Sequence, residues 1–98
     1  MIKARFEWDE FKNLLNQAKH GVSFEEAQYV FLDEKRILAK DAGHSKEEDR
    51  FYCIGHDLER ADIITVRFTY RKGQIQIIGA GYWRKWRKIY ARKNRIQR

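Results

Sequence analysis

Residues 61–80, ADIITVRFTYRKGQIQIIGA, contain the pattern that decides the fold. From residue 61 to residue 71, apolar and polar side chains alternate, which is typical of a β-strand with one buried face. Lys72 and Gly73 follow as a tight turn, because glycine accepts a positive φ at little cost. Residues 74–80 then return as a second strand. The apolar face of the first strand consists of Ile64, Val66, Phe68 and Tyr70, and its polar face of Thr65, Arg67, Thr69 and Arg71.

The sequence before this hairpin predicts three more strands. Residues 50–56 and residues 36–40 are short strands separated by a polar loop over residues 41–49. Residues 2–8 also alternate apolar and polar side chains, and they predict a short N-terminal strand. We expect these segments to form one antiparallel sheet.

Two helices are predicted between the N-terminal strand and the rest of the sheet. The first spans about residues 10–19, begins after the N-cap residue Asp9 and stops at Gly21, a usual residue for a helix C-terminus. The second begins at a capping box formed by Ser23 and Glu26. Helices this close in sequence fold back as a hairpin, and we expect their apolar faces to cover the sheet. Those faces carry Phe11, Leu14, Leu15 and Ala18 in the first helix, and Phe24, Ala27, Val30 and Phe31 in the second.

The order of elements, with a basic helix after residue 81, predicts a small α+β domain over residues 1–98. Cys53 is the only cysteine, so no intramolecular disulfide can form, and a lone thiol suits a reducing compartment. No apolar stretch is long enough to span a bilayer, and charges interrupt the N-terminus where a signal peptide would be apolar. We therefore expect a cytoplasmic protein that has no membrane partner.

The C-terminal segment holds nearly all of the excess charge. Residues 81–98 carry eight Lys or Arg and no Asp or Glu, in a chain whose formal net charge is +7. Aromatic residues interleave with the cations in residues 82–90, YWRKWRKIY. Bases stack on aromatic rings while cations pair with phosphates, so the pattern favours RNA binding. An amphipathic, solvated helix or a site for an acidic protein remains an alternative. The candidate RNA-binding residues are Trp83, Arg84, Lys85, Arg87 and Lys88.

Four residues are candidates for catalysis. Arg67 and Arg71 share the polar face of one strand, where guanidinium groups can hold a phosphate. Lys19 and His20 end the first helix, and an imidazole there can transfer a proton. Both observations have simpler explanations, namely a solvent-facing strand and a histidine that interacts favourably with the helix dipole. No spacing of His, Cys or carboxylate residues suggests a metal site, and we expect no cofactor.

Cleavage of RNA without a metal would require a defined set of groups. A base takes the proton of the 2′-hydroxyl, a cation stabilises the charge on the phosphate, and an acid protonates the departing 5′-oxygen. The sequence contains side chains of each type. Whether they converge is decided only by the fold.

The sequence resembles the BrnT family of toxins over nearly its whole length. The most specific stretch is residues 19–27, KHGVSFEEA. The other matching positions are residues 6–9 (FEWD), 12–13 (KN), 30–31 (VF), 48–50 (EDR) and 77–80 (IIGA), with Asp33, Gly55, Thr69 and Arg71.

The resemblance implies a toxin of a type II toxin–antitoxin system, with a fold similar to RelE-type ribonucleases and activity against RNA that inhibits translation. It also implies neutralisation by a BrnA-type antitoxin, which carries a DNA-binding domain. Two toxins and two antitoxins would form a heterotetramer, and operator DNA would be reached only through the antitoxin. Carried over by position, the functional candidates are Lys19, His20 and Arg71.

One departure from the family pattern concerns the end of the last strand. Much of the family reads Ile-Ile-Ser-Ala-Arg there, whereas this chain has Gly79 and Gly81 in place of the Ser and the Arg. Arg84 and Lys85 are candidates to replace the missing charge. The alternative is a non-catalytic module that binds RNA or antitoxin but no longer cleaves.

Overall fold

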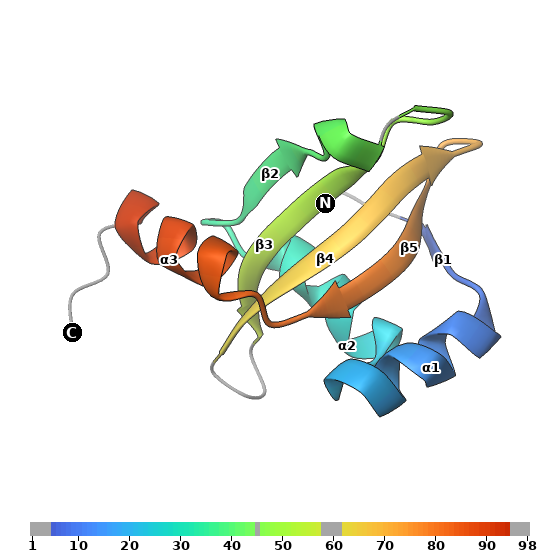
Figure 1. Ribbon diagram of the computed structural model, residues 1–98, viewed down its shortest axis with the longest axis horizontal. Helices are drawn as coiled ribbons and strands as arrows, with labels where there is room; N and C mark the ends of the chain where they lie inside the picture. Colours follow the sequence, from blue (N-terminus) through green and yellow to red (C-terminus); the bar gives the residue numbers. More distant parts are fainter. Residues whose placement is uncertain (1–4, 45, 58–61, 95–98) are drawn as a thin grey trace.

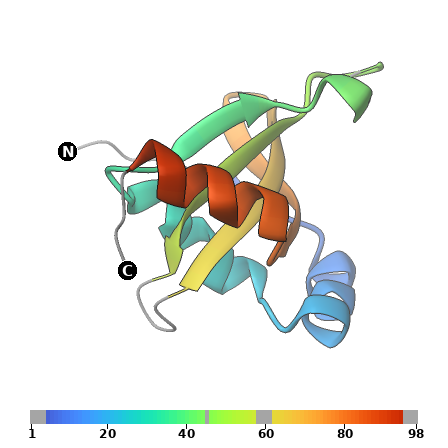
Figure 2. The same cartoon turned by 60° about the vertical axis from the view of Figure 1, so that its left-hand side comes forward.

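Five strands form one sheet in the computed structural model, which describes residues 5–44, 46–57 and 62–94 (Figure 1). The order across the sheet is β1-β5-β4-β3-β2. Of the two helices expected to cover the sheet, α2 lies on one face, whereas α1 lies beside the part of β5 that β1 does not pair with; α3 crosses the opposite face (Figure 2). These elements confirm the predicted α+β class. The strands are β1 (Phe6–Glu7), β2 (Ile37–Lys40), β3 (Phe51–Asp57), β4 (Asp62–Arg71) and β5 (Gln74–Gly81); the helices are α1 (Glu10–His20), α2 (Phe24–Ala27) and α3 (Arg84–Lys93).

The central hairpin of β4 and β5 is confirmed. Lys72 and Gly73 both have positive φ values, 52° and 75°, as a two-residue turn of the I′ type requires. The antiparallel arrangement holds from β2 to β5, but β1 pairs with β5 in parallel. The sheet is therefore mixed, because alternation predicts a strand without fixing its direction. Residues 2–4 of the predicted N-terminal strand lie outside the described residues.

The hydrophobic core lies between the sheet and the second helical segment. Ser23 caps α2 by accepting a hydrogen bond from the Glu26 amide at 3.0 Å, and a 3-10 turn over Gln28–Leu32 continues the helix. Gly55 lies so close to this turn that a Cβ there would approach Val30 Cγ1 to 2.8 Å. The predicted apolar stripe is thus buried against the sheet. The core consists of Val22, Phe24, Ala27, Val30, Cys53, Ile64, Val66, Phe68, Ile77 and Ala80.

The prediction for α1 is wrong about which face is buried. The helix is capped by Asp9 and ends at Gly21, whose φ is 72°, as expected. However, its apolar residues point outward, and the exposed fractions of Phe11, Leu14 and Leu15 are 68%, 57% and 50%. A short helix beside a sheet edge buries only a narrow face, and here that face is polar.

Two asparagines fill the buried face of α1. Asn16 pairs with the free backbone edge of β5, donating to Ala80 O at 2.9 Å and accepting from Ala80 N at 3.2 Å. It also donates to Val22 O at 2.9 Å. Asn13, fully buried, accepts from Phe24 N at 2.8 Å. These side chains form hydrogen bonds with backbone groups that have no neighbouring strand to pair with. Polar residues are therefore favoured on the buried face of α1.

The last helix is anchored to the core through Tyr90. Its hydroxyl donates to Asp33 Oδ2 at 2.6 Å, and the side chain is 3% exposed. Burial by itself would raise the pKa of Asp33, but the hydrogen bonds from Tyr90 and from the His56 and Lys35 amides hold that pKa below its usual value. The position of α3 over the sheet is therefore fixed by a specific, partly buried contact.

The two faces of β4 differ from the sequence pattern in three places. Thr65 and Thr69, expected on an open polar face, are 1% and 2% exposed. Thr69 donates to the carbonyl oxygen of Asp49 at 2.6 Å. Tyr70, expected in the core, is 57% exposed because the helices do not extend over that end of the hairpin.

Candidate functional site

Two neighbouring hollows lie where α1, the sheet and the start of α3 meet. We name the first the basic pocket; its volume is about 220 Å³. We name the second the aromatic pocket; its volume is about 320 Å³. Arg67 and Trp83 line both. The basic pocket is lined by Lys12, Leu15, Asn16, Lys19, His20, Arg67, Ile78, Gly79, Ala80 and Trp83, and the aromatic pocket by Tyr52, Arg67, Trp83, Lys85 and Trp86.

The end of α1 supplies the cations of the basic pocket. Gly21 stops the helix immediately after Lys19 and His20, and Asn16 ties the last turns to β5. Lys12 and Lys19 lie four residues before and three residues after Asn16, so the three side chains share one helix face. Because Asn16 is fixed against the sheet, the two lysines are brought to the same hollow.

A β-bulge brings Arg67 to the same place. Arg67 pairs with Gly79, whereas Phe68 pairs with Ile77, so Ile78 is an extra residue in β5. The bulge puts Gly79 and Gly81 on the same face as Arg67, while Ile77 and Ala80 both face the core. The Arg67 guanidinium lies next to Gly79: a Cβ at residue 79 would be in ordinary contact with Arg67 Nη1, at 4.0 Å.

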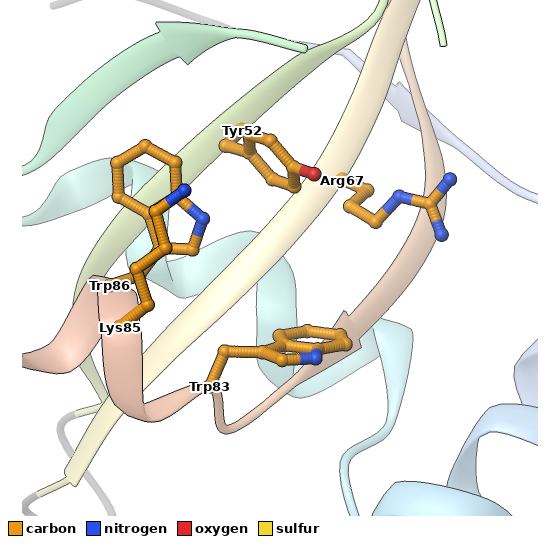
Figure 3. Close-up of a pocket in the computed structure, with 5 residues that line it drawn as sticks. All are labelled: Tyr52, Arg67, Trp83, Lys85 and Trp86. Atoms are coloured by element: carbon orange, nitrogen blue, oxygen red, sulfur yellow. The ribbon is translucent and has the colours of Figure 1, made fainter. Parts of the chain in front are cut away.

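Cross-strand pairing and the first turn of α3 build the aromatic pocket. Tyr52 on β3 is the pairing partner of Arg67 and therefore lies on the same face. Its ring centroid is 5.2 Å from that of Trp86, and Lys85 Nζ lies 5.4 Å from the Trp86 ring. Figure 3 shows Trp86 and Tyr52 at one side of the pocket, and Trp83 and the Arg67 guanidinium at the other. Burial of the side chain is the main reason that the pKa of Tyr52 is raised, and the nearby Asp41 carboxylate raises it further.

Gly81 determines where the indole of Trp83 lies. A Cβ at residue 81 would approach two carbons of that ring to 2.9 and 3.0 Å, and His20 Cγ to 3.5 Å. The ring of Trp83 also lies beside that of His20, with 5.6 Å between centroids. The space next to Gly81 is therefore filled by Trp83, which forms the wall between the two pockets.

Three of the four predicted catalytic residues lie together. Lys19, His20 and Arg67 all line the basic pocket. Arg71 lies four residues further along β4, a span of about 13 Å, and lines neither pocket. Its guanidinium donates two hydrogen bonds to Glu48, at 3.3 and 2.9 Å.

The predicted RNA-binding residues are distributed over two surfaces. Trp83 and Lys85 line the aromatic pocket. Arg87 forms an ion pair with Asp62. Arg84 and Lys88 are exposed on α3 and line neither pocket.

Among the charged and aromatic residues that line the pockets, sequence reasoning missed Lys12, Tyr52 and Trp86. The spacing of Lys12, Asn16 and Lys19 could have identified the first, because it matches one face of a helix. Trp86 lies within the aromatic and basic stretch noted above. Tyr52 required the register of β3 on β4, which the sequence does not give.

The site is cationic, and other reactive groups lie elsewhere. Burial raises the pKa of the Cys53 thiol to about 12, so that residue is an inert part of the core. Among the described residues, no group of three or more His, Cys, Asp or Glu side chains is placed to hold a metal ion. None of the described helices is long and apolar enough to cross a bilayer.

A comparison with models of protein families gives a match over most of the chain. The model of a family described as the ribonuclease toxin BrnT of type II toxin–antitoxin systems matches residues 8–87. A search of curated proteins finds no match. The matched segment begins before α1 and ends within α3, so it includes every residue that lines the two pockets. The chain therefore belongs to the BrnT family of ribonuclease toxins of type II toxin–antitoxin systems.

Proposed function

We propose that this protein is a metal-independent endoribonuclease that cleaves RNA in the cytoplasm and is held inactive by an antitoxin. The observation that carries the proposal is the basic pocket, in which Lys19 and His20 from α1 meet Arg67 from β4. A phosphodiester in this hollow would contact cations from two directions. Such an arrangement stabilises the phosphate most strongly in the transition state, because the negative charge on the phosphate increases there.

The reaction that we assign to the basic pocket is a transfer of the phosphoryl group within the RNA chain. The 2′-oxygen forms a bond to phosphorus, and the bond from phosphorus to the 5′-oxygen breaks. The 2′-hydroxyl loses a proton and the departing 5′-oxygen gains one, so the products are a 2′,3′-cyclic phosphate and a 5′-hydroxyl. We assign proton transfer to His20 and stabilisation of the phosphate charge to Arg67 and Lys19, with Lys12 as a further cation.

A cleavage assay tests this proposal against the non-catalytic alternative. Purified protein is incubated with end-labelled RNA in EDTA, and in parallel with Mg²⁺. We expect discrete fragments with 2′,3′-cyclic phosphate ends under both conditions. Binding should weaken steeply as salt increases, because several phosphate contacts contribute. RNA that is retarded in a gel but stays intact under both conditions would show that the chain binds without cleaving; cleavage only with Mg²⁺ would reject the metal-independent mechanism.

The exposed apolar face of α1 supports a proposal for the antitoxin contact. Phe11, Leu14 and Leu15 lie at helical spacing on one face, and each is at least half exposed. Contiguous apolar side chains of this size on a small domain commonly mark a protein interface. Leu15 also lines the basic pocket, so a partner on this face would extend over the pocket. We propose that an acidic, amphipathic segment of a BrnA-type antitoxin binds here, in a complex of two toxins and two antitoxins.

Substitution of two residues on this face provides a test. Phe11→Ser with Leu14→Ser should weaken antitoxin binding by about 100-fold or more, as expected when two interface anchors are lost. RNA cleavage by the free toxin should persist, because neither side chain lines a pocket. The control is Tyr29→Ser with Leu32→Ser, since those side chains are 55% and 68% exposed but lie away from the basic pocket. Affinity is measured by titration calorimetry and stoichiometry by light scattering. A larger loss of antitoxin affinity in the control variant would mean that the antitoxin binds to the surface that carries Tyr29 and Leu32.

A further inference from the structure

We propose that the aromatic pocket binds the base of the nucleotide next to the phosphate in the basic pocket, with a preference for purines. This inference rests on the proposed ribonuclease function for its ligand. It assigns a nucleobase subsite to Tyr52, Trp83 and Trp86. It also gives the Trp83 and Gly81 pair a specific role, which is to form one wall of that subsite.

The chemistry of the lining favours a ligand that is both aromatic and anionic. Three of the five lining residues are aromatic, and the other two are Arg67 and Lys85. An aromatic pocket for a cationic ligand would be expected to lack such cations, because they repel it. None of the described residues that line the pocket carries a carboxylate. A nucleotide matches both the aromatic and the cationic residues of the lining, since its base stacks on the rings and its phosphate pairs with the cations.

The size and position of the pocket fit a single base. Its volume of about 320 Å³ is at the lower end of the range for small-ligand pockets, roughly 300–1,000 Å³. Arg67 and Trp83 line both hollows, so a base in one would be joined through its sugar to a phosphate in the other. A purine presents a larger face to the rings than a pyrimidine does, and it therefore stacks more strongly.

Gly81 is what allows Trp83 to form a wall of this subsite. A side chain at residue 81 would overlap the Trp83 ring, whose carbons lie 2.9 and 3.0 Å from the position of a Cβ. With glycine there, the indole covers the end of β5 and separates the two pockets. The chain thus places an aromatic wall at the end of β5, and stacking there contributes to RNA binding.

Two non-cleavable oligonucleotides isolate the contribution of the base. The first probe is a pentamer of 2′-O-methyl adenosine, which lacks the free 2′-hydroxyl needed for cleavage. The second is a pentamer of the same length and charge with abasic residues. Both are titrated into the intact protein and followed by calorimetry, with the quenching of tryptophan fluorescence as a second readout. We expect the adenosine pentamer to bind about tenfold or more tightly than the abasic one, and a third probe, a pentamer of 2′-O-methyl uridine, to fall between them.

Variants attribute the effect to the pocket. Trp86→Ala should remove most of the preference for adenosine over abasic RNA, whereas Trp86→Phe should retain part of it. Gly81→Ala should weaken the preference by displacing Trp83, whereas Gly79→Ala should have a smaller effect on Trp83, because its Cβ would meet only ordinary contacts at 3.9 and 4.0 Å. The control is Tyr29→Ala, an exposed aromatic that lines neither pocket.

The outcomes separate this inference from the proposed function. Equal affinity for the adenosine and abasic pentamers, or a preference that survives Trp86→Ala, would overturn the subsite even if the protein cleaves RNA. A base-dependent preference without cleavage of ordinary RNA would support the subsite and reject the ribonuclease proposal. If neither pentamer quenches tryptophan fluorescence but the antitoxin does, the pocket binds protein and the inference is wrong.

Discussion

Arg67→Ala should reduce the rate of RNA cleavage by about 100-fold or more, the usual effect of removing a group that stabilises charge in a transition state. Among the described residues, Arg67 is the one cation that lines both pockets, and its guanidinium lies next to Gly79. Loss of this group would leave the phosphate with cations on one side only. The effect should appear in kcat more than in KM, measured with a fluorescent RNA substrate under single-turnover and steady-state conditions.

The matched comparison is Arg71→Ala, which removes the same side chain from the same strand. Arg71 is paired with Glu48 and lines neither pocket. A surface ion pair contributes little, so the cleavage rate should change by about threefold or less. If both variants lose activity equally, the phosphate is held along β4 as the sequence alone suggests. If only Arg71→Ala loses activity, the basic pocket is not the catalytic site.

Asn16→Ala should destabilise the fold by about 2–4 kcal/mol, because it leaves buried peptide groups without partners. Asn16 makes three hydrogen bonds to the backbone, two of them to the edge of β5 at Ala80. This loss is large for a small domain, whose total stability is typically about 5–15 kcal/mol. Urea unfolding followed by circular dichroism gives the change directly.

Leu14→Ala provides the contrast on the same helix. Its side chain is 57% exposed, and a surface substitution of this kind should change stability by about 0.5 kcal/mol or less. In an ordinary amphipathic helix, replacing the leucine would reduce the stability more than replacing the asparagine. A larger loss for Leu14→Ala than for Asn16→Ala would mean that α1 buries its apolar face after all, and the proposed antitoxin surface would then be wrong.

The sequence predicted the central elements well because local patterns define them. Alternation identified β4 and β5, and the Lys72-Gly73 pair defined the turn between them, as confirmed by positive φ values. Gly21 and Ser23 placed the end of one helix and the beginning of the next. In each case the stabilising contact lies within a few residues along the chain, so the sequence contains both partners.

The same reasoning failed for the orientation of α1, because periodicity shows that a helix has two faces but not which one is buried. The free edge of β5 between residues 78 and 81 offers peptide groups that need partners, and asparagines satisfy them. That demand arises only once β1 has been placed beside the first part of β5. A local sequence pattern cannot predict a hydrogen bond between residues that are 64 positions apart.

The residue types of the site could be predicted from the sequence, but their arrangement in space could not. The cationic and aromatic character of the C-terminal segment, the Lys19-His20 pair and the arginines of β4 are all properties of the chain itself. The tertiary structure alone decided that Arg67 joins Lys19 and His20 while Arg71 pairs with Glu48. The physical reason is the bulge at Ile78 together with the register of β3 on β4, which depend on pairing energies summed over the whole sheet.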